Sequence, residues 1–179
     1  MSILNGLTTA STDEITITVT AGNQDAADLV ALNGKTNQQI DVSALTSIHT
    51  INGTAAELTN IYDTNVSEYN GLGNENITID DTVSISEATT IAGYTSEDTN
   101  ITLSAASIDA TDITTLNTAN GNGTIDGSNL TAINGSVSEI NAALSDLDTN
   151  PANFDSTLSA QLLNGCSNSG AAVIESSIT

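Results

Sequence analysis

The stretch Ile51-Asn-Gly-Thr-Ala-Ala-Glu-Leu58 contains the pattern that recurs along this chain: a Ser, Thr or Asp, two residues, an acid, and then apolar residues. Other copies are Asp25-Ala-Ala-Asp28, Ser84-Ile-Ser-Glu87, Asp109-Ala-Thr-Asp112 and Ser136-Val-Ser-Glu139, with a looser copy at Ser156-Thr-Leu-Ser159. Successive copies start roughly 20–30 residues apart, which is the period range of repeat proteins. A unit of this size cannot bury its own apolar face, so it must stack on neighbouring units.

Each copy of the pattern predicts the start of a short helix. The first Ser, Thr or Asp accepts a hydrogen bond from the backbone three residues on, and the acid at that position can reach back to the cap. The apolar residues that follow are then expected to face inward; they are Leu29 and Leu32, Leu58 and Ile61, Ile113 and Leu116, and Ile140 and Leu144. Asn-Gly steps such as Asn33-Gly34 and Asn52-Gly53 are typical of a helix stop or a tight turn.

Between the capped segments, apolar residues alternate with small polar ones. This period of two, with many β-branched residues, predicts half-buried strands. The stretches are Ile15-Thr-Ile-Thr-Val19, Ile77-Thr-Ile79, Val83-Ser-Ile85, Ile101-Thr-Leu103 and Thr124-Ile-Asp126.

Together these patterns predict an elongated repeat solenoid, mainly β, with one short strand and a one-to-two-turn helix in each repeat. The 179 residues are expected to form a single repeat domain, with close repeats at about 25–83 and diverged ones at about 84–165. Two copies align at length: residues 28–33 with 112–117, 41–48 with 126–133, and 52–58 with 134–140. Aromatic residues are only 2% of the chain, and such a composition with many acids is also typical of a disordered chain. The regular spacing of the apolar residues argues against disorder.

The charge is one-sided, with 22 acids against a single base, Lys35, and a net charge of −21. Such a surface repels phosphate backbones and anionic membranes, so neither nucleic acid nor membrane is expected as a partner. Solubility and adaptation to salty water explain the acids, and divalent-cation binding is the alternative.

A specific calcium site has one weak candidate, formed by Asn120, Asn122, Asp126 and Asn129. The spacing resembles a calcium loop, but asparagines stand where acids should supply charge, so an Asn/Gly turn is the favoured reading. His49 is the only histidine, and no Ser/His/Asp set accompanies it. We therefore expect no catalytic or cofactor-binding residues, no required metal and no enzymatic activity.

Both ends of the sequence resemble the middle of a repeat. Ile3-Leu-Asn-Gly-Leu-Thr8 and Leu162-Leu-Asn-Gly-Cys-Ser167 match Ala31-Leu-Asn-Gly-Lys-Thr36, so the end segments 1–8 and 162–179 are expected to form contacts in an assembly. Cys166 is alone, which rules out an internal disulfide and leaves a passive thiol or an intermolecular bond. The first residues lack a basic segment and a long apolar segment, so no signal peptide is expected.

Residues 27–36, 51–58 and 71–78 resemble the Thr-Ala-Ala-Glu-Leu repeats of marine cyanobacteria and their phages. The resemblance is close over about residues 25–83 and implies a structural, non-enzymatic protein. It implies an outer fibre, knob or capsid or tail decoration at the virion surface, with itself and other structural proteins as partners. The alternative is a secreted extracellular filament or surface adhesin of a marine bacterium.

Overall fold

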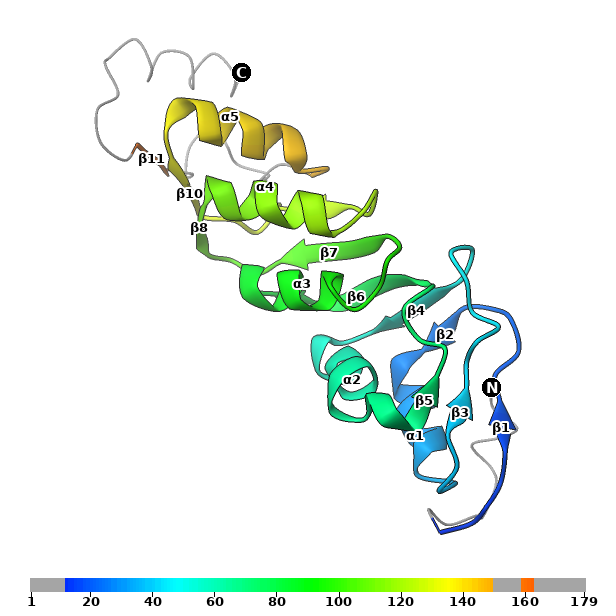
Figure 1. The fold of residues 1–179 in the computed structure, drawn as a ribbon. Coiled ribbons are helices and arrows are strands. Elements are labelled where there is room, and N and C mark those ends of the chain that lie inside the picture. The colour runs from blue at the N-terminus through cyan, green and yellow to red at the C-terminus, as the bar shows by residue number, and fades with distance from the viewer. Residues whose placement is uncertain (1–11, 150–158, 163–179) are drawn as a thin grey trace. The chain divides into compact units, whose positions relative to one another are not determined.

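The computed structural model describes residues 12–149 and the backbone of residues 159–162, in which short strands alternate with helices (Figure 1). The end segment 1–8, Cys166 and the rest of the C-terminal segment beyond Leu162 lie outside the described residues, as does most of the looser copy at 156–159. The elements in chain order are β1 Ile17–Thr18, β2 Gln24–Asp25, α1 Ala26–Asn33, β3 Ile40–Asp41, β4 Thr50–Gly53, α2 Ala55–Thr59, the π-helix η2 Asn60–Thr64, the 3-10 helix η3 Val66–Glu68, β5 Tyr69–Asn70, β6 Asn76–Val83, α3 Ile85–Ala92, β7 Thr99–Leu103, β8 Ser107–Asp109, α4 Ala110–Ala119, β9 Ile125–Asp126, β10 Ala132–Gly135, α5 Val137–Asp146 and β11 Ser159–Leu162.

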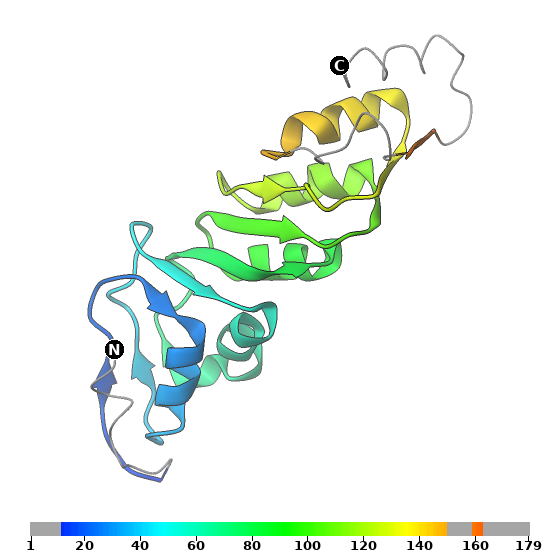
Figure 2. The same ribbon diagram turned by 180° about the vertical axis from the view of Figure 1, so that it is seen from behind.

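The chain divides into two units, of which the first comprises residues 1–81 and 91–100. In its described part, β1, β3 and β5 form a parallel sheet in which Ile17 lies opposite Ile40, and Ile40 lies opposite Tyr69. A second set of parallel strands places β4 between β2 and β6, as seen from behind in Figure 2. Helices α1 and α2 each follow a strand of this second set and pack against each other.

The second unit comprises residues 82–90 and 101–179. Its sheet places β10 between β8 and β11, with all three strands parallel, and β7 pairs with β9 in the same sense. Helices α4 and α5 follow β8 and β10 and lie side by side (Figure 1). The order strand, helix, parallel strand therefore recurs in both units, as parallel pairing requires a crossover connection.

Aliphatic side chains from strands and helices build the core. Those that are fully buried include Leu29, Leu32, Ile40, Leu45, Ile51, Leu58, Ile61 and Ile77 in the first unit, and Leu103, Ile113 and Leu116 in the second. Complete burial of such a side chain contributes about 1.5–3 kcal/mol. Seven of the eight helix residues that were predicted to face inward are buried, namely Leu29, Leu32, Leu58, Ile61, Ile113, Leu116 and Ile140. The prediction is wrong for Leu144, which is half-buried, because Ala143 takes the inward position in α5.

The expected strands are confirmed where a full alternating run lies within one element. Ile77-Thr-Ile79 lies in β6 and Ile101-Thr-Leu103 lies in β7. Only residues 17–18 of the run 15–19 belong to a strand, and residues 125–126 form β9. Val83-Ser-Ile85 is not one strand, because Val83 ends β6, Ser84 caps a helix and Ile85 begins α3.

The prediction of a mainly β solenoid with one strand and a one-to-two-turn helix per repeat is wrong. The described residues form a mixed α/β fold with parallel sheets and five α-helices, and α4 and α5 have 10 residues each. The prediction failed because four of the five α-helices, α1, α3, α4 and α5, run for 8 to 10 residues, which is more than two turns. The two-residue strands β3 and β5, by contrast, are too short to show a period of two.

Candidate functional site

The acids of the recurring pattern close the N-termini of helices. In the first unit, the Thr54 hydroxyl donates to the Glu57 carboxylate at 2.8 Å, while the Thr54 backbone N–H donates to the same carboxylate at 2.9 Å. In the second unit, the backbone N–H groups of Ser84 and Ser136 likewise donate to the carboxylates of Glu87 and Glu139, whose own N–H groups donate back to the serine hydroxyls. The Ser84 hydroxyl also donates to Glu87, at 2.7 Å. The expected capping box is confirmed in these three copies.

These caps change the acidity of two exposed carboxyl groups. The Ser84 hydroxyl, followed by the Ser84 backbone N–H, lowers the pKa of Glu87. The Ser136 backbone N–H, followed by its hydroxyl, lowers the pKa of Glu139. A lowered pKa keeps both groups ionised at neutral pH. A carboxylate is stabilising at the N-terminus of a helix, which is the positive end of the helix dipole.

The two Asp copies of the pattern behave differently. The Asp25 carboxylate accepts from the Ala27 backbone N–H at 2.8 Å, two residues on instead of three. Asp109 makes no side-chain cap hydrogen bond at the start of α4. The expected reciprocal box is therefore wrong at these two sites, where the cap and the acid three residues later are both short Asp residues whose carboxylates repel each other.

A second recurring feature is the turn that follows β3 and β9. The Asp41 carboxylate accepts from the Ser43 backbone N–H at 3.0 Å, and Asp126 accepts from Ser128 at 2.8 Å. The Ser43 hydroxyl and then its backbone N–H lower the pKa of Asp41. The aligned copies therefore share a turn geometry as well as a sequence.

Three of the four calcium candidates make hydrogen bonds to backbone groups of the protein. The Asn120 amide donates to the Gly123 carbonyl at 2.5 Å, and the Asn129 amide donates to the Leu103 carbonyl at 3.2 Å. Asp126 closes its own turn, and Asn122 lies in the exposed part of the same loop. Within the residues that the structure describes, no group of three or more His, Cys, Asp or Glu side chains is placed to hold a metal ion.

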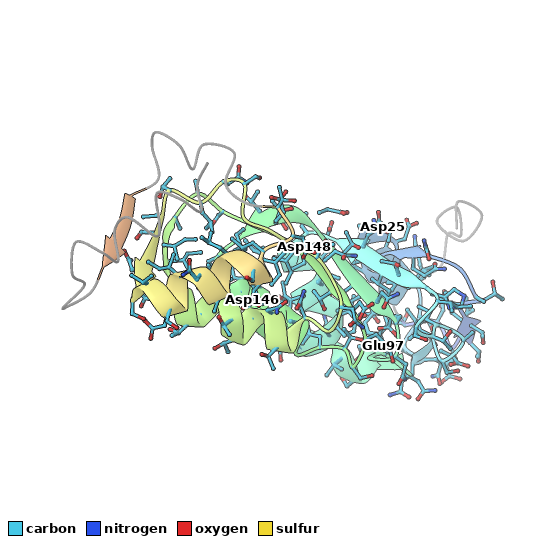
Figure 3. The ribbon with its side chains drawn as sticks, turned by 90° about the horizontal axis from the view of Figure 1, so that it is seen from above. Asp25, Glu97, Asp146 and Asp148 are labelled. Atoms are coloured by element: carbon cyan, nitrogen blue, oxygen red, sulfur yellow. The ribbon has the colours of Figure 1, made fainter. Side chains whose placement is uncertain are left out.

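Figure 3 shows Asp146 at the end of α5 and Asp148 shortly after it. One Asp146 carboxylate oxygen accepts from the Asn117 amide of α4 at 3.0 Å, and its other oxygen is buried with no hydrogen-bond partner in the described structure. Asp148 accepts from the Ile125 backbone N–H at 2.8 Å. Both acids therefore join neighbouring elements of the second unit.

The first unit contains a buried polar cluster that the sequence reasoning missed. Glu75 is fully buried and accepts hydrogen bonds from the Tyr62 hydroxyl, the Gly73 N–H at 3.0 Å and the Asn74 N–H at 3.1 Å. Burial, followed by the charge of Glu75, raises the pKa of Tyr62, whose ring stacks on Tyr94 with centroids 5.4 Å apart. The cluster fixes the 71–75 loop.

Two shallow hollows of the surface lie within the described part of the chain. One, of about 380 Å³, is lined by Ile85, Ser86, Thr89, Thr90, Asp112 and Thr115. The other, of about 300 Å³, is formed by residues 18–24. In the first hollow, the hydroxyls of Thr89, Thr90 and Thr115 donate to carbonyls of their own helices, so their protons are used structurally.

His49 lies in a turn between Leu45 and β4, where the Thr46 backbone N–H donates to its Nδ1 at 3.1 Å. His49 therefore lies in a loop, half-buried. Among the described residues, no helix combines the length and the apolar character needed to cross a bilayer.

Comparisons of the chain with family models, with curated proteins and with solved structures found no match.

Proposed function

We propose that this chain is a structural, non-enzymatic component of an assembled particle, an outer fibre, knob or decoration of a virion. The observation that carries the proposal is that polar side chains at matched positions of the two aligned copies form the same stabilising hydrogen bonds. Each copy contains an Asp turn, at 41–43 and at 126–128, and each contains a capping box, at 54–57 and at 136–139. Repetition of bracing contacts is what a scaffold requires.

Within each unit, close packing between successive copies of the sequence pattern supports the same proposal. A Cβ atom on Gly53 would lie 2.7 Å from the Cβ of Ala26, and one on Gly135 would lie 3.1 Å from the Cβ of Ala110. Each glycine thus lets a strand approach the helix of the preceding copy. The two glycines therefore allow close packing between successive copies of the pattern.

The parallel sheets supply a means of assembly. In the described part of the chain, β1 has β3 as its single neighbour, and the Val19 N–H donates inward to the Asp41 carbonyl. The backbone groups of Thr18 therefore point to the outer edge, because neighbouring residues of a strand face opposite sides. Such an edge can pair with a strand of a second copy or of another structural protein.

The acidic surface fits exposure at the outside of a particle in salty water. A net charge of −21 opposes non-specific sticking at low salt, and salt screens it so that specific contacts can form. The sequence resemblance to repeats of marine cyanobacteria and their phages points to a cyanophage virion. The second candidate is an extracellular filament or adhesin of the host, because the same resemblance covers secreted surface proteins.

Assembly is tested by sedimentation velocity at rising sodium chloride concentration. The wild-type chain should form larger species as salt increases, and Thr18→Pro should reduce them because proline removes the outward N–H without touching the bond to β3. Ser47→Pro is the matched control, since Ser47 is exposed at the second position of a turn where proline fits. A wild-type chain that stays monomeric at all salt concentrations would contradict the assembly role.

A further inference from the structure

The turn at residues 46–49, which we name the His49 turn, is present in one of the two aligned copies. In the first copy four residues separate Leu45 from β4, whereas in the second copy Thr131 alone separates Leu130 from β10. The sequence alignment of residues 46–48 with 131–133 is therefore wrong, and the extra residues of the first copy lie in this turn. The turn holds Ile48 with 82% of its surface exposed, the larger exposure of the two exposed large apolar side chains, Ile48 and Val66, in the described structure. Exposing a large apolar side chain to water is unfavourable, so the extra segment is not explained by folding stability alone.

Two hydrogen bonds close the His49 turn in opposite directions. The Thr46 backbone N–H donates to Nδ1 of His49 at 3.1 Å, and the His49 backbone N–H donates to the Thr46 carbonyl at 2.8 Å. A backbone N–H can only donate, so Nδ1 must be an unprotonated acceptor. The neutral ring in this structure therefore has its proton on Nε2.

The neighbouring strand fixes the outer half of the turn. The Asn76 amide donates to the Ser47 carbonyl at 2.8 Å, and the Asn76 backbone N–H donates to the His49 carbonyl at 2.9 Å. The Thr46 hydroxyl lies 3.3 Å from Nδ1 and can serve the same acceptor. Ile48 is thus held by contacts on both sides of it, and the imidazole supplies the acceptor that orders Thr46.

We propose that the His49 turn is a pH-responsive element that presents Ile48 in an ordered conformation when the imidazole is neutral. A proton taken from solvent by Nδ1 converts this atom from acceptor to donor and sets an N–H against the Thr46 N–H. The Thr46 hydrogen bond is then lost, and Ile48 becomes mobile between the remaining contacts to Asn76. The Thr46 hydroxyl, which can also donate to Nδ1, has to turn so that its oxygen faces the protonated atom.

Other titratable groups on the adjoining strands and segment are carboxylic acids. They are Asp25 on β2, Asp80 and Asp81 at the far end of β6, and Glu97 and Asp98 in the segment before β7. Asp98 is joined to the turn through Asn76, whose side-chain oxygen accepts from the Asp98 backbone N–H at 3.1 Å. Lys35 is the one Lys or Arg in the chain and His49 is its one histidine, so no second imidazole takes part in the proposed change.

The proposal is tested by NMR of the full chain across the titration of the His49 ring. The amide proton of Thr46 should move upfield as it loses its acceptor, with the same midpoint as the ring protons. The amide of Ser43 is an internal control, because it donates to the Asp41 carboxylate at 3.0 Å in a comparable turn. It should not move over the range in which the ring titrates.

Two variants separate the role of His49 as a hydrogen-bond acceptor from the effect of protonating its ring. His49→Asn places an amide oxygen at the position of Nδ1 and should keep the Thr46 amide shift constant with pH. His49→Ala removes the acceptor and should give the acid-form Thr46 shift at every pH, with amide exchange faster by up to about tenfold. A wild-type Thr46 amide that stays constant while the ring titrates, or a transition that persists in His49→Asn, would overturn the proposal; the wild-type measurement decides even if a variant fails to fold.

Discussion

Gly53 of β4 lies directly against Ala26, the first residue of α1, so that a Cβ atom at position 53 would be 2.7 Å from the Cβ of Ala26. Real Cβ atoms do not approach this closely, and the strand or the helix would have to shift. Gly53→Ala should therefore destabilise the first unit by about 1–3 kcal/mol through overpacking. Urea unfolding followed by circular dichroism measures the loss.

A control and a rescue variant make this prediction specific. Gly34→Ala should be neutral or stabilising by up to about 1 kcal/mol, because Gly34 has φ −69° and its added Cβ would meet no atom nearer than 3.5 Å. The double variant Ala26→Gly/Gly53→Ala should recover most of the stability lost in Gly53→Ala. Equal losses in the single and double variants would show that the contact with Ala26 is not the cause.

The two serine caps of the second unit should respond differently to loss of the hydroxyl. The largest cause of the lowered pKa of Glu87 is the Ser84 hydroxyl, whereas that of Glu139 is the Ser136 backbone N–H. Ser84→Ala should therefore raise the pKa of Glu87 more than Ser136→Ala raises the pKa of Glu139. Carboxyl carbon NMR titration measures both; shifts in the reverse order would contradict these cap geometries.

The lowered pKa values of Glu87 and Glu139 also determine how the stability of the two helix starts depends on pH. A carboxyl group whose pKa is lower in the folded chain than its ordinary value of 4.5 contributes stability above that pH. The contribution of Glu87 and Glu139 should be present at neutral pH and be lost as the pH falls through their folded pKa values. Amide exchange at the first turns of α3 and α5, compared with Glu87→Gln and Glu139→Gln, should show the loss in wild type alone.

The buried carboxylate of Glu75 should be the most sensitive acid of the first unit. Glu75→Ala leaves the Tyr62 hydroxyl and two backbone N–H groups without their acceptor, which costs about 1–3 kcal/mol for each buried donor that water cannot reach. Glu75→Gln should cost less, since one oxygen remains. Asp63→Asn, an exposed site that loses the same charge, should change stability little by urea unfolding.

Alkaline pH should weaken the first unit through Tyr69. Burial, followed by the charge of Glu68, raises the pKa of Tyr69 from 10.0 to about 12, and its hydroxyl donates to the Leu29 carbonyl at 3.1 Å. Between these two pH values the unfolded chain releases the proton and the folded chain keeps it, so the free energy of unfolding falls with pH. Tyr69→Phe should be less stable at neutral pH and lose stability less steeply above pH 10; a slope equal to that of wild type would refute the assignment.

The local elements were predictable where a chemical signature lies within a few residues. The pairs Thr54 with Glu57 and Ser136 with Glu139 mark helix starts, because both partners of a capping box lie within one turn. The Asp turns at 41–43 and 126–128 follow from an alignment visible in the sequence. The buried carboxylate of Glu75 was not predictable, since its tyrosine partner lies 13 residues away and no local pattern marks a buried acid.

The balance of strand and helix was also beyond the sequence pattern. The strands β3 and β5 have two residues each, and the contacts that make them strands come from partners far along the chain. Helix α2 continues as the π-helix η2, where the Asn65 N–H donates to the Asn60 carbonyl, and helix propensity carries no sign of this widening. Of the proposed calcium residues, Asn120, Asp126 and Asn129 form turn and strand contacts that a lone spacing motif cannot distinguish from ligation.

Gold-labelled antibodies against this chain, imaged by electron microscopy on intact particles and on intact host cells, test the central claim most directly. The account predicts label at regular positions on the outside of virions, with none on virions that lack the protein. Label on filaments or on the surface of uninfected cells would support the extracellular reading instead. Label confined to the interior of cells, with none on particles or surfaces, would contradict a structural role in an exposed assembly.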